Sequence, residues 1–416
     1  MTIRKIRLLL GILGTLVAAE TLAGGLWLNE YGSPVQARAG AGAQAGTDDA
    51  SAGFFNPAAM SRLDQPEIML TGGVIYPTME FNVDQAGTAN GTGDGGDAGE
   101  WTPGGSLFYV HPLNDRWALG VSGVAMSGAG IDYQDDWAGR YQATDVDLLV
   151  AGLVPAISYR INDRFSVGLS LPVMYGDLTL KVAIPSPLDP VAGPDGRAKI
   201  TGDDIQVGVT AGAMFEVSDR TRLGLIYQSK FDFEFDGDIE IDPVGYEVGV
   251  DTELPLAAIV RLGLQHTFSD QVRGHLTLGW DDWSDLDNVM LSTSSGGLPL
   301  PRNWHDTYHS ALGLEYDLSG RWGLQGGVAY DTSPTNGADR TADMPMDRQI
   351  RYALGAEYRR DNGMKIAASF VYADYGDGKI NSARNPPLVG VQGEYDDNNI
   401  IFFSLSANWK LGSRQP

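Results

Sequence analysis

The side chains of this chain that most readily carry acid–base or metal chemistry are its five histidines. His305 and His309 are four residues apart, a spacing that would place both rings on one side of a helix as a metal pair. On a β-strand they would share a face but lie roughly 13 Å apart, which is too far to hold one ion. Because this part of the sequence alternates like a strand, we predict no metal site there.

A catalytic arrangement needs a nucleophile and a base on one face. His275 precedes Asp281 in a second alternating run, and serine is abundant, but the chain has no cysteine and no Gly-x-Ser-x-Gly motif. Asp94 and Asp97 flank two glycines and could hold calcium, although an acidic loop explains them equally well. We therefore expect no catalytic residue, no cofactor and no enzymatic activity.

Three arginines, Arg261, Arg273 and Arg351, stand on the polar side of alternating runs. A guanidinium group recognises a planar carboxylate well, so these are the candidate partners of an anionic head group, if the ligand has one. The alternative is pairing with acidic side chains of the same faces, namely Asp281, Glu315, Asp331 or Glu357.

The elements that would position these side chains are β-strands joined by a recurring tight turn. Similar turn motifs recur at intervals of 42 to 56 residues, and each lies between two alternating runs, as a hairpin turn should. The motifs are Asn114–Arg116, Asn162–Arg164, Ser218–Arg220, Ser269–Gln271, Ser319–Arg321 and, more loosely, Asp361–Gly363. Short turns on one side and long loops on the other are typical of a transmembrane β-barrel of the bacterial outer membrane.

Fourteen alternating runs can be counted, an even number, as single-chain bacterial barrels require. They fall near 67–82, 102–112, 116–131, 142–160, 164–180, 198–216, 221–236, 252–267, 271–283, 305–317, 321–333, 346–359, 364–375 and 398–411. Apolar faces such as Leu254–Leu264 should meet lipid, because aromatic residues lie at the strand ends on that side. Segments such as 237–251 and 284–304 should be long outer loops.

The composition agrees with this class. The formal net charge is −24, which argues against nucleic-acid binding, and the absence of cysteine excludes disulfides. Residues 1–23 read as a signal peptide, with Arg4, Lys5 and Arg7 before an apolar run and cleavage after Ala23, or after Ala19 as the alternative.

Residues 24–63 are rich in small side chains and do not alternate. A barrel of 14 strands would be an open channel without something inside it, so we place this segment in the lumen and call it the hatch. The chain thus divides into a signal peptide (1–23), the hatch (24–63) and a 14-stranded antiparallel barrel (64–416).

The mature chain resembles the FadL family of outer-membrane transporters for long-chain fatty acids and other hydrophobic compounds. The resemblance is carried by Gly24–Glu30, Arg38–Gly42, Thr47–Ser51, Asn56–Ala58, Trp280–Ser284, Tyr330–Pro334, Arg348 and Gly355–Tyr358. It implies that an apolar ligand is caught among outer loops, passes to a tighter pocket near the hatch and leaves sideways through a kink in the third strand. The pocket-facing residues of the hatch would be Phe54, Phe55, Asn56, Pro57 and Ala58.

The sequence of the third strand favours such a kink independently. Gly128, Ala129 and Gly130 lie inside the run, and glycine within a strand marks bulges and broken pairing. An ordinary glycine in a chain with 54 of them is the alternative.

We therefore expect passive uptake of hydrophobic compounds, whether fatty acids, hydrocarbons or detergents, through a monomeric barrel in contact with outer-membrane lipids and lipopolysaccharide. A general porin or a ligand-displaying barrel is the alternative, and a barrel hydrolase is less favoured.

Overall fold

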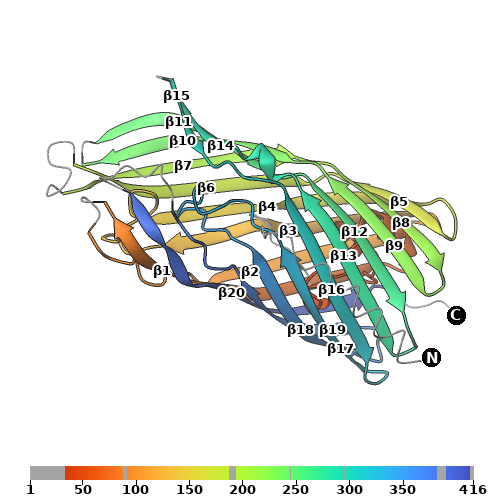
Figure 1. Ribbon diagram of the computed structural model, residues 1–416. Coiled ribbons are helices and arrows are strands. Elements are labelled where there is room, and N and C mark those ends of the chain that lie inside the picture. Colours follow the sequence, from red (N-terminus) through yellow and green to blue (C-terminus); the bar gives the residue numbers. More distant parts are fainter. Residues whose placement is uncertain are drawn as a thin grey trace.

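The computed structural model describes residues 33–87, 91–186, 194–243, 245–294, 296–381 and 390–412. The signal peptide expected at 1–23 and the first residues of the hatch, 24–32, lie outside the described residues. The described chain forms an elongated, closed β-barrel with a short helical segment inside it (Figure 1).

The barrel is one antiparallel sheet of 20 strand segments. Eight of them are single unbroken strands of the barrel wall: β1 (Glu67–Ala86), β2 (Thr102–Pro112), β3 (Trp117–Asp132), β4 (Asp145–Arg160), β17 (Trp322–Asp331), β18 (Gln349–Arg359), β19 (Lys365–Asp374) and β20 (Val391–Lys410). The other twelve join end to end as six pairs, so that the wall has 14 strands, as predicted. These are β5 (Phe165–Ser170) with β6 (Val173–Ile184), β7 (Gly196–Val207) with β8 (Thr210–Ser218), β9 (Thr221–Gln228) with β10 (Phe231–Asp242), β11 (Tyr246–Leu256) with β12 (Ile259–Thr267), β13 (Val272–Asp281) with β14 (Asn288–Thr293), and β15 (Gly296–Pro301) with β16 (Thr307–Asp317). Pairing of β1 with β20 closes the barrel.

The recurring motif makes the tight turns at one end. The Asn114 side chain accepts hydrogen bonds from the backbone of Arg116 and Trp117, at 2.9 and 3.0 Å, and Asn162 does the same for Arg164 and Phe165. Such bonds from a short polar side chain to its own backbone fix a turn. In the serine versions a hydroxyl takes this place, as Ser319 does for Arg321 and Trp322.

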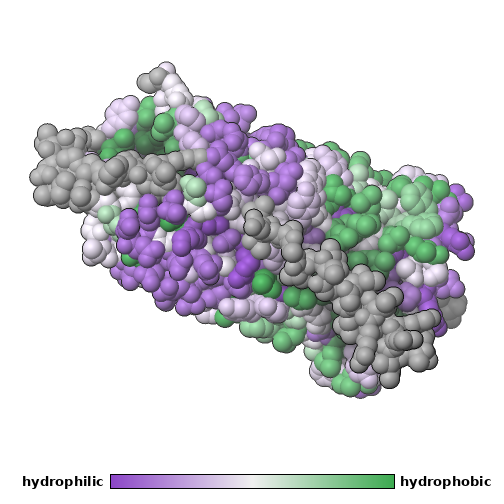
Figure 2. Space-filling model, viewed as in Figure 1, coloured by the Kyte–Doolittle hydropathy of each residue, from purple (hydrophilic) through white to green (hydrophobic). Residues whose placement is uncertain are grey.

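The outward faces near the short turns are apolar. Leucine and valine side chains there are exposed, and Figure 2 shows apolar side chains gathered on strands β8, β9, β12 and β13 towards this end. Aromatic pairs stand at the strand ends, with Trp117 against Tyr159 and Trp322 against Tyr358. This is the arrangement of a lipid-facing band with an interfacial girdle.

Two expectations about the strands were wrong. Leu254 and Leu256 do not face lipid with Leu262 but point inward, because the strand breaks at Ala257–Ala258 and the alternation shifts by one residue. The segments 237–251 and 284–304 are not simple loops, since the hairpins β10–β11 and β14–β15 continue the sheet beyond the apolar band.

The described part of the hatch lies inside the barrel. It comprises the helix α2 (Ser33–Gln36), consecutive turns, the helix α3 (Ala52–Phe55) and the 3₁₀-helix η1 (Pro57–Arg62), and most of its residues are buried. Alanine and glycine dominate because the backbone runs against the wall: a side chain on Gly327 would meet the backbone of Arg38 at 2.2 Å. No described helix has the length and apolar character needed to span a membrane.

Candidate functional site

An apolar pocket opens between the outer hairpins, at the end opposite the short turns. It consists of two adjoining cavities of about 970 and 420 Å³, which share the side chains Leu180, Ile200, Leu291, Leu300, Arg302 and Asp343. We call them together the outer pocket. Arg302 and Asp343 form a buried ion pair in its wall, with Nη2 and Oδ2 2.6 Å apart. The pair neutralises Arg302, and Asp339 adds a further carboxylate to the wall.

A second apolar surface lies deeper in the lumen. Phe231, Phe233 and Phe235 alternate along β10 with acidic residues, and their rings point inward, with centroids 6.3 and 5.3 Å apart. They belong to one buried cluster that also contains Leu254, Leu256, Met174, Trp283, Phe55 and Phe108. The cluster extends the apolar lining from the outer hairpins to the hatch.

The predicted pocket-facing residues of the hatch lie at this apolar surface and just below it. Phe55 belongs to the cluster and Phe54 packs against it, with its ring centroid 6.4 Å from that of Phe108. Asn56, Pro57 and Ala58 are buried against β5 and β8 instead. Only the two phenylalanines are therefore positioned to meet an apolar ligand.

The Asn56 side chain forms hydrogen bonds to two other residues of the hatch and to strand β8 of the wall. Its Nδ2 donates to the carbonyl oxygens of Gln44 and Ala213, at 2.8 and 3.0 Å, and its Oδ1 accepts from the amide of Ala58 at 3.0 Å. The side chain is fully buried. One amide thus bonds two buried backbone groups of the hatch and one carbonyl of β8.

We expect Asn56→Ala to destabilise the folded protein by about 2 kcal/mol, because two buried backbone groups of the hatch lose their partner and the hatch loses its bond to β8. The temperature at which the purified protein loses its heat-modifiable gel mobility should fall. Asn288→Ala is the control, since the Asn288 side chain, at the start of an outer hairpin, donates to its sequence neighbour Asp287 and to no other described residue. Equal unfolding temperatures for both variants would contradict this role of Asn56.

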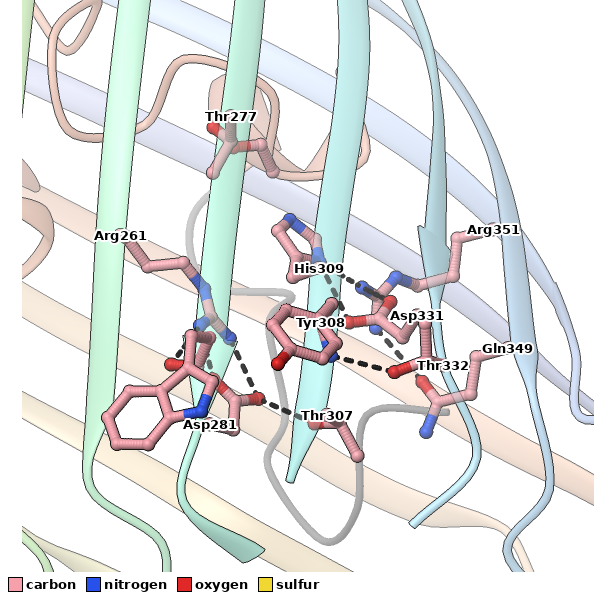
Figure 3. Close-up of polar contacts among 12 residues, drawn as sticks. Arg261, Thr277, Asp281, Thr307, Tyr308, His309, Asp331, Thr332, Gln349 and Arg351 are labelled. Carbon is pink, nitrogen blue, oxygen red and sulfur yellow. Dashed lines mark hydrogen bonds and ion pairs between the residues drawn. The ribbon is translucent and has the colours of Figure 1, made fainter. Parts of the chain in front are cut away.

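The three arginines predicted for a head group are all ion-paired. Arg261 binds Asp281 with both terminal nitrogens, and Arg351 binds Asp331, which also contacts His309 Nδ1 at 2.8 Å. Figure 3 shows these two groups on neighbouring strands, with their side chains pointing into the lumen. Arg273 pairs with Glu315 at 2.9 Å and with Asp317 at 3.5 Å. The charges of the three guanidinium groups are therefore already neutralised.

A polar cavity of about 600 Å³ lies at the short-turn end. It is lined almost entirely by charged or amide side chains, among them Arg38, Asp49, Glu315, Glu357 and Lys365. Arg38 of the hatch forms a buried ion pair there with Glu315. This end of the lumen is an unfavourable environment for an apolar molecule.

The wall is incomplete between β2 and β3. Their ladder runs from Pro112 opposite Ala118 to Leu107 opposite Gly123 and ends there, while β3 continues to Asp132 paired with β4. Contact with the segment before β2 resumes only at the end of β3, where Ile131 bridges Gly99 and the Asp132 amide donates to the Ala98 carbonyl. The register of the β3–β4 pair also shifts between Ala125 and Ser127. Gly128 and Gly130 lie in this part of β3, and a Cβ atom added to Gly128 would meet no heavy atom within 4 Å. Ala129 lies between them on the same strand.

A cavity of about 660 Å³, part of it open to the outside, occupies this place, and we call it the side cavity. Some of its lining residues are outward-facing and exposed, namely Val74, Leu149 and Phe403, at 39%, 45% and 46%. Others face the lumen and are buried, namely Gln36, Phe402 and Ser404. The side cavity therefore crosses the wall from the hatch to the lipid-facing surface.

Sequence reasoning did not find Arg302, Asp343 or Gln36, because nothing in the pattern around them differs from an ordinary polar residue. The inward orientation of three phenylalanines could have been predicted from the sequence. They alternate with acidic residues, and acidic side chains would not face lipid, so the phenylalanines must face the lumen wherever the strand lies in the membrane or beyond it. The phenylalanines are Phe231, Phe233 and Phe235, and the acidic residues are Asp232, Glu234 and Asp236.

Comparison with known proteins agrees with this geometry. The chain is 25% identical over 398 residues to the long-chain fatty acid transport protein of Salmonella typhi, covering 87% of this chain and 91% of that protein. It is 25% identical over 405 residues to outer membrane protein P1 of Haemophilus influenzae strain Rd, covering 86% and 87%. The fold matches the crystal structure of a Pseudomonas aeruginosa FadL homologue with a TM-score of 0.86 at 24% identity, over 94% of this chain and all of that one.

A more distant structural match is the toluene transporter TodX of Pseudomonas putida, with a TM-score of 0.70 at 18% identity over 93% of this chain and all of that one. Residues 14–410 match the family model described as outer membrane protein transport protein (OMPP1/FadL/TodX). The chain therefore belongs to this family of bacterial outer-membrane β-barrels, whose members are transporters of fatty acids and hydrophobic aromatics rather than enzymes.

Proposed function

We propose that this chain takes up hydrophobic compounds by passive diffusion and releases them sideways into the outer membrane through the side cavity. One observation carries the proposal above all: a cavity lined by both lumenal and lipid-facing residues lies where the β2–β3 ladder ends. The names of relatives, which include a long-chain fatty acid transport protein and a toluene transporter, agree with an apolar cargo.

The proposed path passes through three parts of the barrel interior. A compound binds first in the outer pocket, where Leu180, Ile200 and Leu291 give it an apolar surface. It then moves along the buried phenylalanines of β10 to Phe54 and Phe55 of the hatch. From there the side cavity leads outward between β2 and β3, over apolar side chains that include Phe402 and Phe403.

A sideways exit is favoured by the cost of the other direction. An apolar molecule that leaves through the short-turn end would have to cross the charged cavity at Arg38 and Glu315 and enter water. Exposure of apolar surface to water costs about 25 cal/mol per Å². The hatch also occupies that part of the lumen, which argues against a general porin. A molecule that moves from the apolar side cavity into lipid does not expose its apolar surface to water.

Neutral compounds suit this path better than anions. Arg261, Arg273, Arg351 and Arg302 each have a carboxylate partner. An anionic ligand at any of them would compete with that carboxylate and would place a second negative charge beside it. We infer that the lumenal arginines fasten the wall and that the cargo is bound mainly through its apolar surface.

The test is uptake by cells that lack their own transporter of this kind. Cells that carry this chain should take up an alkane and an alkylbenzene faster than cells with an empty vector, and the advantage for a fatty acid of equal length should be smaller. Equal rates with and without the protein for every compound would contradict the proposal. Faster uptake of small sugars would instead favour the porin alternative.

A further inference from the structure

The hatch presents a polar side chain at the inner end of the side cavity. Gln36 is 3% exposed and lines the cavity. Its Oε1 accepts hydrogen bonds from the hydroxyl groups of Ser369, at 2.9 Å, and Ser404. Within the described part of the chain its Nε2 makes no hydrogen bond, so both N–H donors of the amide are unused.

A second polar group of the same cavity also has no partner. The hydroxyl oxygen of Thr71 on β1 is buried and makes no hydrogen bond to any described residue. Buried polar groups in proteins are nearly always hydrogen-bonded, so the Thr71 hydroxyl and the Gln36 amide are both available to bond a molecule held in the cavity.

The rest of the cavity is apolar and uncharged. Val74, Ile75, Leu149, Phe402 and Phe403 form most of its side-chain surface, and no charged side chain is among its described lining residues. A carboxylate would find no cation there. The shape and polarity fit a neutral molecule that has an apolar body and a hydrogen-bond acceptor at one end.

We infer that Gln36 is a specificity-determining residue, and that the side cavity holds neutral oxygen-bearing hydrophobic compounds such as ketones, esters or alcohols by hydrogen bonding their oxygen to Gln36 Nε2. This inference rests on the proposed function, because the side cavity is the exit of the proposed path. Pure hydrocarbons pass the same cavity without this bond. Ser369 and Ser404 are positioning residues, since their hydroxyl groups hold the amide oxygen and so direct Nε2 into the cavity.

The experiment compares uptake of dodecane and dodecan-2-one, which share a chain but differ in one acceptor oxygen. Gln36→Leu and Gln36→Met both remove the amide donors and leave an apolar side chain of similar size. Both variants should lower ketone uptake by about threefold to tenfold, the range of one net hydrogen bond, and leave dodecane uptake unchanged. Ser369→Ala should give a smaller loss for the ketone alone.

Unchanged ketone uptake in Gln36→Leu would overturn the inference, as would an equal fall for both compounds. Equilibrium binding of the ketone to purified protein distinguishes failure of the Gln36 inference from failure of the proposed transport function. If neither compound is transported but Gln36→Leu still weakens ketone binding by threefold or more, the binding site stands and the transport proposal fails. If binding is also unchanged, the inference fails as well.

Discussion

Deletion of the hatch, residues 24–63, is expected to turn the barrel into an open ion channel. The described part of the hatch, residues 33–63, is largely buried against the inside of the wall and is bonded to it through Arg38, Asn56 and Gln36. A 14-stranded barrel without such filling has an interior wider than side chains can close. Conductance of the purified protein in planar bilayers should therefore rise about tenfold or more on deletion.

The barrel itself should survive this deletion. Closure is made by β1 and β20, which pair from Glu67 opposite Lys410 to Ala86 opposite Val391, and the hatch takes no part in this ladder. The wall arginines Arg261 and Arg351 keep their carboxylate partners. Heat-modifiable gel mobility of the protein that lacks residues 24–63 would show whether its barrel is folded. A folded, deleted barrel that conducts no better than the full chain would refute the plugging role of the hatch.

Gly128→Trp is expected to block transport without harming the fold. Gly128 lines the side cavity, a Cβ atom added there would meet no heavy atom within 4 Å, and its backbone is not left-handed. The indole ring can therefore occupy the cavity. Uptake of dodecane should fall about tenfold or more, since the apolar exit through the wall is then filled. Binding of the same compound at the outer pocket should stay unchanged.

Position 128 is a sharper site for this test than its neighbour Gly130. A side chain on Gly130 would meet the carboxylate of Asp147 at 3.2 Å. Gly320→Trp is the matched control, because Gly320 lies in a short turn and also has no heavy atom within 4 Å of an added side chain. Uptake in Gly128→Trp that equals uptake in Gly320→Trp would contradict a role of the side cavity.

The barrel could be predicted from the sequence because its turn motifs and its strand alternation are each confined to a short stretch of residues. Asn114, Asn162 and Ser319 form the turns through bonds to backbone two or three residues away, so the motif and the structure are the same short stretch. Alternation with period two is likewise a local property of each strand. Strand number and closure follow once the turns have been located.

The lining of the lumen was harder to predict because it depends on contacts between distant segments. The inward orientation of Leu254 and Leu256 results from a strand break at Ala257–Ala258, which shifts the alternation by one residue. The two alanines give no signal of a break, although Pro255 lies two residues before it. Arg302 and Asp343 are 41 residues apart in sequence. Gln36 meets Ser369 and Ser404 from the other end of the chain.

The exit route can be tested most directly by photolabelling during transport. A diazirine-bearing alkane would be irradiated while it crosses the protein in native outer membranes, and the labelled peptides would be identified by mass spectrometry. We expect label on residues of the side cavity, in 71–75, 102–106 and 402–404, and none on the polar cavity at the short turns. Label on 315–325 and 357–365, with none at the side cavity, would show that the compound leaves through the lumen and would contradict the lateral route.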